Sequence, residues 1–203
     1  MDIMKIIDQA KDICLNPAGT IKKLKDKKVT KNDIIIYLAV VGFPTFLGVL
    51  IGYGVLLGGT GFFGWGFGLA ILQYILSIGG IIVFGYVFNA LAPNFKTKSN
   101  LMQAVKLVSY AATPWLLLGI VYIWPPAGAI VFLGGLYGLY ILYLGIPILM
   151  GTPKDQHLAY LIVGIIAYFV IMVIIWWIIG AIWASFVWHS YYGPYSGPHW
   201  WYP

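Results

Sequence analysis

Few side chains in this 203-residue sequence are of the types that carry out acid–base, nucleophilic or metal chemistry. Every charged residue is one of twelve Lys or six Asp, and there is no Glu and no Arg. Of the three histidines, His157 lies in a polar elbow, 151–157, between two apolar runs, and His189 and His199 lie near the end of the chain. Catalysis needs a positioned acid, base or nucleophile, and a metal site needs three or four converging ligands. We therefore expect no catalytic residue, no metal and no cofactor.

The elements that would have to position any reactive group are membrane helices. Hydrophobic residues make up 61% of the chain and charged residues 9%, with a mean hydropathy of +0.89, whereas soluble domains carry about 25% charged residues. The apolar runs exceed the roughly 20 residues that a helix needs to cross a bilayer. They are apolar all round, unlike the alternating strands of a membrane barrel. We predict an all-α, polytopic membrane protein with five transmembrane helices at roughly 34–57, 67–91, 105–124, 127–150 and 158–184.

The positions of the charges predict the topology. No charged residue occurs in 34–95, 107–153 or 156–203, so the charges fall in 1–33, in the 92–106 loop and in the elbow. With five spans, these three regions lie on one side of the membrane. Cytoplasmic segments are the ones enriched in Lys. We therefore expect a multi-pass cell-membrane protein with a cytoplasmic N-terminus and an extracytoplasmic C-terminus.

The first 33 residues form a cytoplasmic segment of two predicted short helices. Apolar residues recur at helical spacing over 3–14, which indicates an amphipathic helix, and Asn16 and Pro17 have the types of an N-cap and a first helical residue. The lysines that follow could each contribute about 1 kcal/mol at an anionic membrane surface. One interpretation is a collar that only fixes orientation, and the other is a dedicated lipid or partner site. The residues concerned are Lys22, Lys23, Lys25, Lys27 and Lys28.

The predicted spans contain a few polar side chains. Their single Lys or Asp is Lys106, at the start of the third span. Polar side chains in membrane helices usually hydrogen-bond to a neighbouring helix or to their own backbone. An alternative is that Gln73, Ser77, Ser109 and Thr113 line a path for a small neutral solute. The sequence leaves a permease open on this basis.

The chain ends in an aromatic segment, 189–203, that follows the membrane domain, 34–188. Six of the last thirteen residues are Tyr or Trp, with Pro and Gly between them. Such a segment can anchor the chain at the membrane interface or contact a protein, since Trp and Tyr dominate interface hot spots. The predicted partners are anionic lipid headgroups at the inner face and either another protein or a second copy of the chain, with no nucleic acid. The candidate contacts are Tyr191, Tyr192, Tyr195, Trp200, Trp201 and Tyr202.

Several short motifs resemble the Yip1 family in its shorter prokaryotic, archaeal form. They are the Asn-Pro pair of the N-terminal segment, the Pro-Asn-Phe that opens the second inner loop, the stretch SYAATP and, most specifically, LYGLYILYLGIPILMGTPKD. The resemblance runs from about residue 15 to residue 184 and implies a five-helix membrane fold. The motif residues are Asn16, Pro17, Pro93, Tyr110, Thr113, Pro114, Tyr140, Gly145, Pro147, Thr152, Pro153 and Asp155.

Two features depart from that family pattern. Gln156 and His157 stand where relatives often have Lys and a small residue, and the aromatic segment extends past the usual end of the fifth helix. Eukaryotic relatives take part in Golgi and endoplasmic-reticulum trafficking with small GTPases. Their cytosolic signature has no counterpart in residues 1–33, so we do not carry GTPase binding over.

These considerations make the elbow a turn rather than a reactive site. Gly151 has the type that ends a helix, Thr152 is expected to cap the next turn, Pro153 fits its first position, and Asp155 suits its positive end. The predicted function is a non-catalytic membrane organiser or accessory subunit. The alternative function is the neutral-solute permease or channel.

Overall fold

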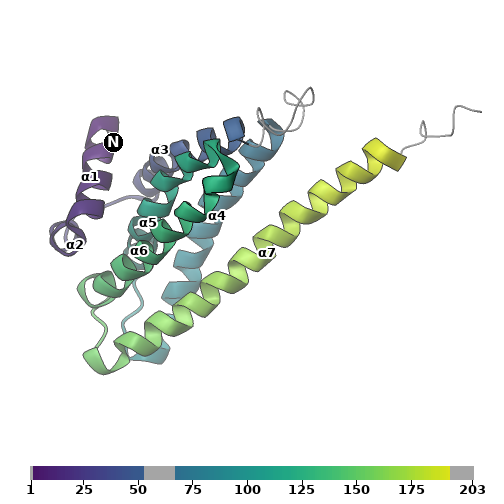
Figure 1. The fold of residues 1–203 in the computed structure, drawn as a ribbon. Coiled ribbons are helices and arrows are strands. Elements are labelled where there is room, and N and C mark those ends of the chain that lie inside the picture. The colour runs from purple at the N-terminus through teal and green to yellow at the C-terminus, as the bar shows by residue number, and fades with distance from the viewer. Residues whose placement is uncertain (1, 53–66, 193–203) are drawn as a thin grey trace, which may run out of the picture.

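The computed structural model describes residues 2–52 and 67–192, and within these ranges it is all helical, without strands (Figure 1). Five helical segments are long and apolar enough to span a membrane, which confirms the predicted fold class. The long helices are α1 Ile3–Leu15, α2 Pro17–Lys25, α3 Lys31–Val49, α4 Phe67–Leu91, α5 Leu101–Leu118, α6 Ala129–Gly145 and α7 His157–Tyr192. Short helical turns occupy η4 Ala92–Phe95, η5 Gly119–Ile123, η6 Pro125–Gly128, η7 Ile146–Met150 and η8 Lys154–Gln156.

The N-terminal segment forms the two predicted helices, because each has a capping group at its start. Asp2 accepts a hydrogen bond from the backbone N–H of Met4 and begins α1. Asn16 accepts one from the N–H of Gly19 at 3.1 Å, and Pro17 is the first residue of α2, as the sequence predicts. Such caps satisfy backbone donors that a helix leaves free at its first turn.

Helix α5 is the centre of the bundle. It packs against α3, α4 and α6, and the α1–α2 hairpin covers part of the face that remains. Leu107, Thr113 and Leu116 are fully buried. The sequence of α5 is less apolar than the sequences of the other spans. Burial explains this difference, because polar side chains of α5 can form hydrogen bonds within the protein rather than face lipid.

Glycines allow α5 and α6 to approach closely. A Cβ atom placed on Gly134 of α6 would lie 2.8 Å from the Cα and 2.9 Å from the backbone nitrogen of Trp115 in α5. A Cβ on the adjacent Gly135 would meet nothing within 4 Å. Of these two glycines, Gly134 is therefore the one that allows close helix packing, and Gly135 has no such role.

We predict that Gly134→Ala destabilises the protein by about 1–3 kcal/mol, because the new methyl group must push two helix backbones apart. Gly135→Ala is the matched control and should be neutral or stabilising by up to about 1 kcal/mol, since Ala is the better helix former. Thermal unfolding in detergent measures both. Equal stability of the two variants would contradict the close approach.

Helix α7 is attached to the bundle along α4 and diverges from it towards its C-terminal end (Figure 1). The attachment is aromatic: Tyr160 stacks on Phe88 with ring centroids 4.3 Å apart, and Tyr168 meets Phe84 edge to face. Beyond this contact the side chains are largely exposed, with Trp177 at 79%. In a bilayer this half of α7 faces lipid or another protein.

The described part of α7 ends at Tyr192, so the helix continues four residues into the expected aromatic segment, 189–203. Tyr191 and Tyr192 belong to the helix backbone. The remaining candidate contact residues of that segment, Tyr195, Trp200, Trp201 and Tyr202, lie outside the described residues.

Candidate functional site

The candidate site is the end of the bundle at which the N-terminal hairpin and two loops meet. Thr97 of the second loop donates a hydrogen bond to Thr152 of the elbow at 2.9 Å, and both side chains are buried. Beside them, Lys96 and Asp155 form an ion pair at 3.4 Å whose side chains are 71% and 60% exposed. An exposed pair of this kind contributes little stability, so the buried threonine pair joins the two loops.

The elbow differs from its predicted capping scheme in one respect. Gly151 ends η7 in the left-handed conformation with φ 66°, as expected of a helix-terminating glycine. Thr152 does not cap the next turn, and its hydroxyl instead accepts the hydrogen bond from Thr97. The turn η8 has no side-chain cap, and Pro153 precedes it rather than opening it. Contact with the neighbouring loop thus replaced the local cap, which is a tertiary effect that the elbow sequence does not contain.

Lys106 lies deeper in the third span than the sequence interpretation placed it. The span begins at Leu101 rather than near residue 105, so Lys106 is in the second turn of α5 instead of at its start. Its side chain is only 1% exposed. The Nζ atom donates to the backbone carbonyls of Leu24, Lys25 and Lys27, the last two at 3.3 and 3.0 Å.

The carbonyls of Leu24 and Lys25 lie in the last turn of α2, and that of Lys27 lies two residues past its end. The last carbonyls of a helix have no i+4 partner within it, although that of Leu24 also accepts a hydrogen bond from the N–H of Lys27 at 3.2 Å. A cation at this end also interacts favourably with the helix dipole. Gln103 of α5 adds a hydrogen bond to the Lys25 carbonyl at 3.0 Å. One turn of α5 therefore caps α2 and fastens the N-terminal hairpin to the membrane domain.

The other contacts of the hairpin spread this attachment over the bundle. The buried side of α1 carries Ile6 and Ile13, both fully buried. The carbonyl of Cys14 accepts a hydrogen bond from the Tyr137 hydroxyl of α6 at 2.8 Å. Burial raises the pKa of the Cys14 thiol, so the thiol stays protonated at neutral pH. Ile21 of α2 is fully buried and packs towards Gly145.

The five lysines that the sequence suggested as membrane-facing are all exposed on the hairpin and the segment after it: Lys22, Lys23, Lys25, Lys27 and Lys28. Their ammonium groups are free for an anionic surface, although Lys25 and Lys27 also give backbone carbonyls to Lys106. The same stretch of chain therefore contacts α5 through its backbone and presents positive charge outward.

Of the four polar side chains proposed to line a solute path, only Ser109 borders one of the two hollows described. Thr113 shares a hydrogen bond of 2.7 Å with the Tyr37 hydroxyl of α3, Ser109 donates to the Val105 carbonyl of its own helix, and Ser77 donates to its own helix at 2.9 Å. Gln73 is half-buried on α4. Among the cavities described, the polar one between α1, α3 and α5 measures ≈ 10 Å³, about the room for one water molecule.

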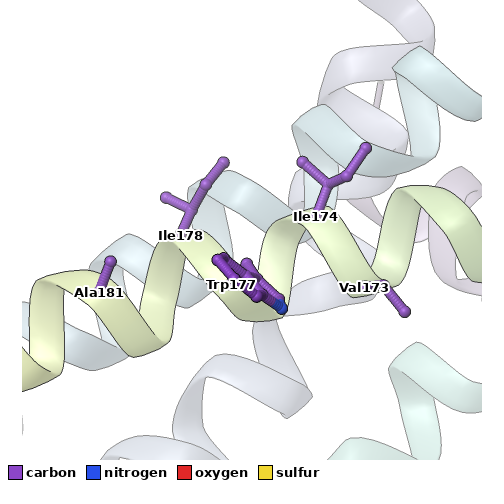
Figure 2. A pocket seen from close by; sticks show the side chains of 5 residues that line it. All are labelled: Val173, Ile174, Trp177, Ile178 and Ala181. Carbon is purple, nitrogen blue, oxygen red and sulfur yellow. The ribbon is translucent and has the colours of Figure 1, made fainter.

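The other described hollow is a shallow groove along α7 with an entirely apolar lining (Figure 2). Its side chains are those of Val173, Ile174, Trp177, Ile178 and Ala181, which project from successive turns of the one helix. A groove without polar atoms cannot orient a polar solute. Such an apolar surface is typical of a helix face that contacts lipid or another helix.

The remaining motif residues mostly have structural surroundings. Tyr110 lies edge to face with Tyr37, with ring centroids 5.5 Å apart, and Pro114 lies inside α5. Pro93 and Pro147 lie in the short turns η4 and η7. Tyr140 is the exception, because half of it is exposed on α6.

Five membrane-spanning helices with a docked N-terminal hairpin define a polytopic integral membrane protein. The Yip1 domain model matches residues 11–178, and the chain belongs to the Yip1 family. Two similar proteins are inner membrane protein YohC of Escherichia coli strain K12 and of Escherichia coli O6:H1 strain CFT073. Each is 31% identical over 121 residues, which cover 55% of this chain and 62% of the relative's length. No solved structure matches the chain.

Both named relatives are bacterial, so they do not support the archaeal form that the sequence motifs suggested. They are inner membrane proteins by name, in agreement with a membrane location.

We predict that Lys106→Met loosens the hairpin, because three carbonyls lose their charged donor while the side-chain volume is nearly kept. The expected loss is about 2 kcal/mol of local stability, a roughly 30-fold faster amide hydrogen exchange in residues 17–29. Lys98→Met, which removes an exposed lysine from the second loop, is the control and should leave this exchange unchanged. Equal exchange rates in the two variants would mean that the Lys106 contacts do not hold the hairpin.

Proposed function

We propose that this Yip1-family protein is a non-catalytic membrane organiser or accessory subunit that acts through contacts with other proteins and with lipids. The observation that carries the proposal is how the polar groups of the spans are used. Tyr37, Ser109 and Thr113 are hydrogen-bonded within the helix bundle instead of facing a solute-sized space. A permease would need such a space, lined by groups that can exchange water for solute.

The proposed contact surfaces are at the two ends of the chain. At the inner end, the hairpin is fixed to α5 by Lys106, so its lysines are displayed in a defined position. At the other end, the aromatic segment follows the part of α7 that has left the bundle. An uncharged segment of this composition is suited to contact with a protein, because exposed apolar patches usually mark interaction sites.

We expect that deleting residues 190–203 removes a subunit from the purified complex, or converts an oligomer into a monomer. Full-length and shortened protein are extracted from native membranes in mild detergent, and native masses and co-purifying proteins are compared. A Trp200→Ala, Trp201→Ala double variant, which keeps the segment's length, should weaken the same association. If the full-length protein, the shortened protein and the double variant all fold and have the same native mass and the same partners, contact through the aromatic segment is contradicted.

A transport assay in vesicles tests the permease alternative. Proteoliposomes of the full-length protein should swell in a gradient of a small neutral solute such as glycerol no faster than empty vesicles. Protein-dependent solute entry, lowered by Thr113→Val, would contradict the organiser proposal and favour the permease.

We further propose that the N-terminus is cytoplasmic and the C-terminus extracytoplasmic, on the basis of the lysine distribution. In a background with Cys14→Ser, Ser196→Cys should react with a membrane-impermeant thiol reagent on intact cells. Ser99→Cys, in the exposed second loop, should react only after the cells are opened. The reverse pattern of labelling would overturn this orientation.

A further inference from the structure

Helix α1 uses only half of its apolar surface to pack on the bundle. Ile6, Ala10 and Ile13 are buried against it. Four more apolar side chains are mostly exposed: Ile3 at 59%, Met4 at 65%, Ile7 at 50% and Leu15 at 74%. At 100° per residue, these four form a sector next to the buried one and away from Lys5 and Asp12. The exposed Lys11 lies within this sector and Asp8 lies at its border, so the sector is apolar with one lysine in it. We refer to Ile3, Met4, Ile7 and Leu15 as the free edge of α1.

The contacts of α1 show at what level of the bundle the free edge lies. Gln9 lines the same small cleft as Asp33, Tyr37 and Ser109. Asp33 lies in the first turn of α3 and is the last charged residue before the apolar run of the first span. Helix α1 is therefore located where α3 passes from water into the bilayer.

Helix α1 also crosses the bundle rather than continuing a span. Gln9 lies beside the start of α3, and five residues later the carbonyl of Cys14 reaches Tyr137 of α6. Between these points α1 contacts α5. A helix that runs across the spans at the level of the membrane boundary lies near the plane of the interface, the position of an interfacial amphipathic helix.

The charges that follow α1 determine which surface it meets. Five exposed lysines occur within residues 22–28, with Asp26 as the one acidic residue among them. Positive charge next to an exposed apolar edge is the combination that binds anionic lipid, since insertion and electrostatic attraction act together. Ile35 and Ile36, just beyond Asp33 on α3, are 47% and 40% exposed, as expected where helices face lipid.

We propose that the free edge of α1 inserts among inner-leaflet lipids with anionic headgroups, held there by the lysines of α2 and the segment after it. This inference rests on the proposed function, because it assigns the lipid contact of that proposal to particular residues. Docking by Lys106 fixes the depth of the edge. The hairpin then couples the local lipid composition to α5, the central helix.

The test uses the full-length protein with Cys14→Ser, reconstituted in vesicles of phosphatidylethanolamine and phosphatidylglycerol. A fluorophore is attached at Ile7→Cys on the free edge or, as the matched control, at Lys5→Cys on the polar side of the same helix. Lipids with a nitroxide near the top of the acyl chain should quench the label at position 7 at least about twofold more than at position 5. Aqueous iodide should show the opposite order.

Two results would overturn the inference. Strong iodide quenching at position 7 would place the edge in water, and protection from both quenchers would place it against a protein. In the variant with the five lysines of residues 22–28 changed to Gln, the nitroxide quenching at position 7 should fall and lose its dependence on phosphatidylglycerol. Quenching that is unaffected would refute the part assigned to the lysines.

Failure here is distinguishable from failure of the proposed function. If position 7 is in water while the complex purified from native membranes is still lost on deletion of 190–203, only the lipid contact of α1 is wrong. If the edge is in lipid and no partner or oligomer is found, the lipid inference survives without the protein contacts.

Discussion

A single ammonium group bonded to three carbonyls connects the two parts of this protein. Lys106 is buried in the second turn of the central helix and donates to the end of α2. A charge in this environment is tolerated only when donors and acceptors match closely. The end of α2 and the segment just after it supply the three carbonyls, so the buried ammonium group is matched by acceptors at one point. The position of the hairpin, and with it the display of the lysines, depends on this match.

Hydrogen bonding within the protein also satisfies polar groups in the membrane-spanning helices. Backbone and side-chain groups must be satisfied inside the protein where no water is available. Tyr37 and Thr113 satisfy each other between α3 and α5, and Tyr160 donates to the Phe88 carbonyl of α4 at 2.6 Å. These bonds join helices that are far apart in sequence. They give Tyr37, Thr113 and Tyr160 hydrogen-bond partners within the bundle.

The sequence was sufficient for the parts of the fold that depend on local chemistry. Apolar runs and the Asn16–Pro17 start of α2 are properties of short stretches, and both correspond to the structure. The hydrogen-bond partners of Thr152 and of Lys106 could not be obtained in this way, because each partner lies 50 or more residues away in the sequence. A signal for Lys106 did exist: it is a lone cation next to a span whose other residues are uncharged. The sequence cannot identify the carbonyls that Lys106 contacts, because every residue has a backbone carbonyl.

Helix α7 has 36 residues, which corresponds to about 54 Å, whereas the hydrocarbon core of a bilayer is about 30 Å thick. An upright helix of this length would extend well beyond the membrane, and tilting is the usual accommodation of such a mismatch. The contacts of Tyr160 and Tyr168 with α4 hold the first part of α7, and the rest diverges from the bundle. We therefore expect the thickness of the bilayer to influence the tilt of α7 and the distance between its C-terminal end and the other spans.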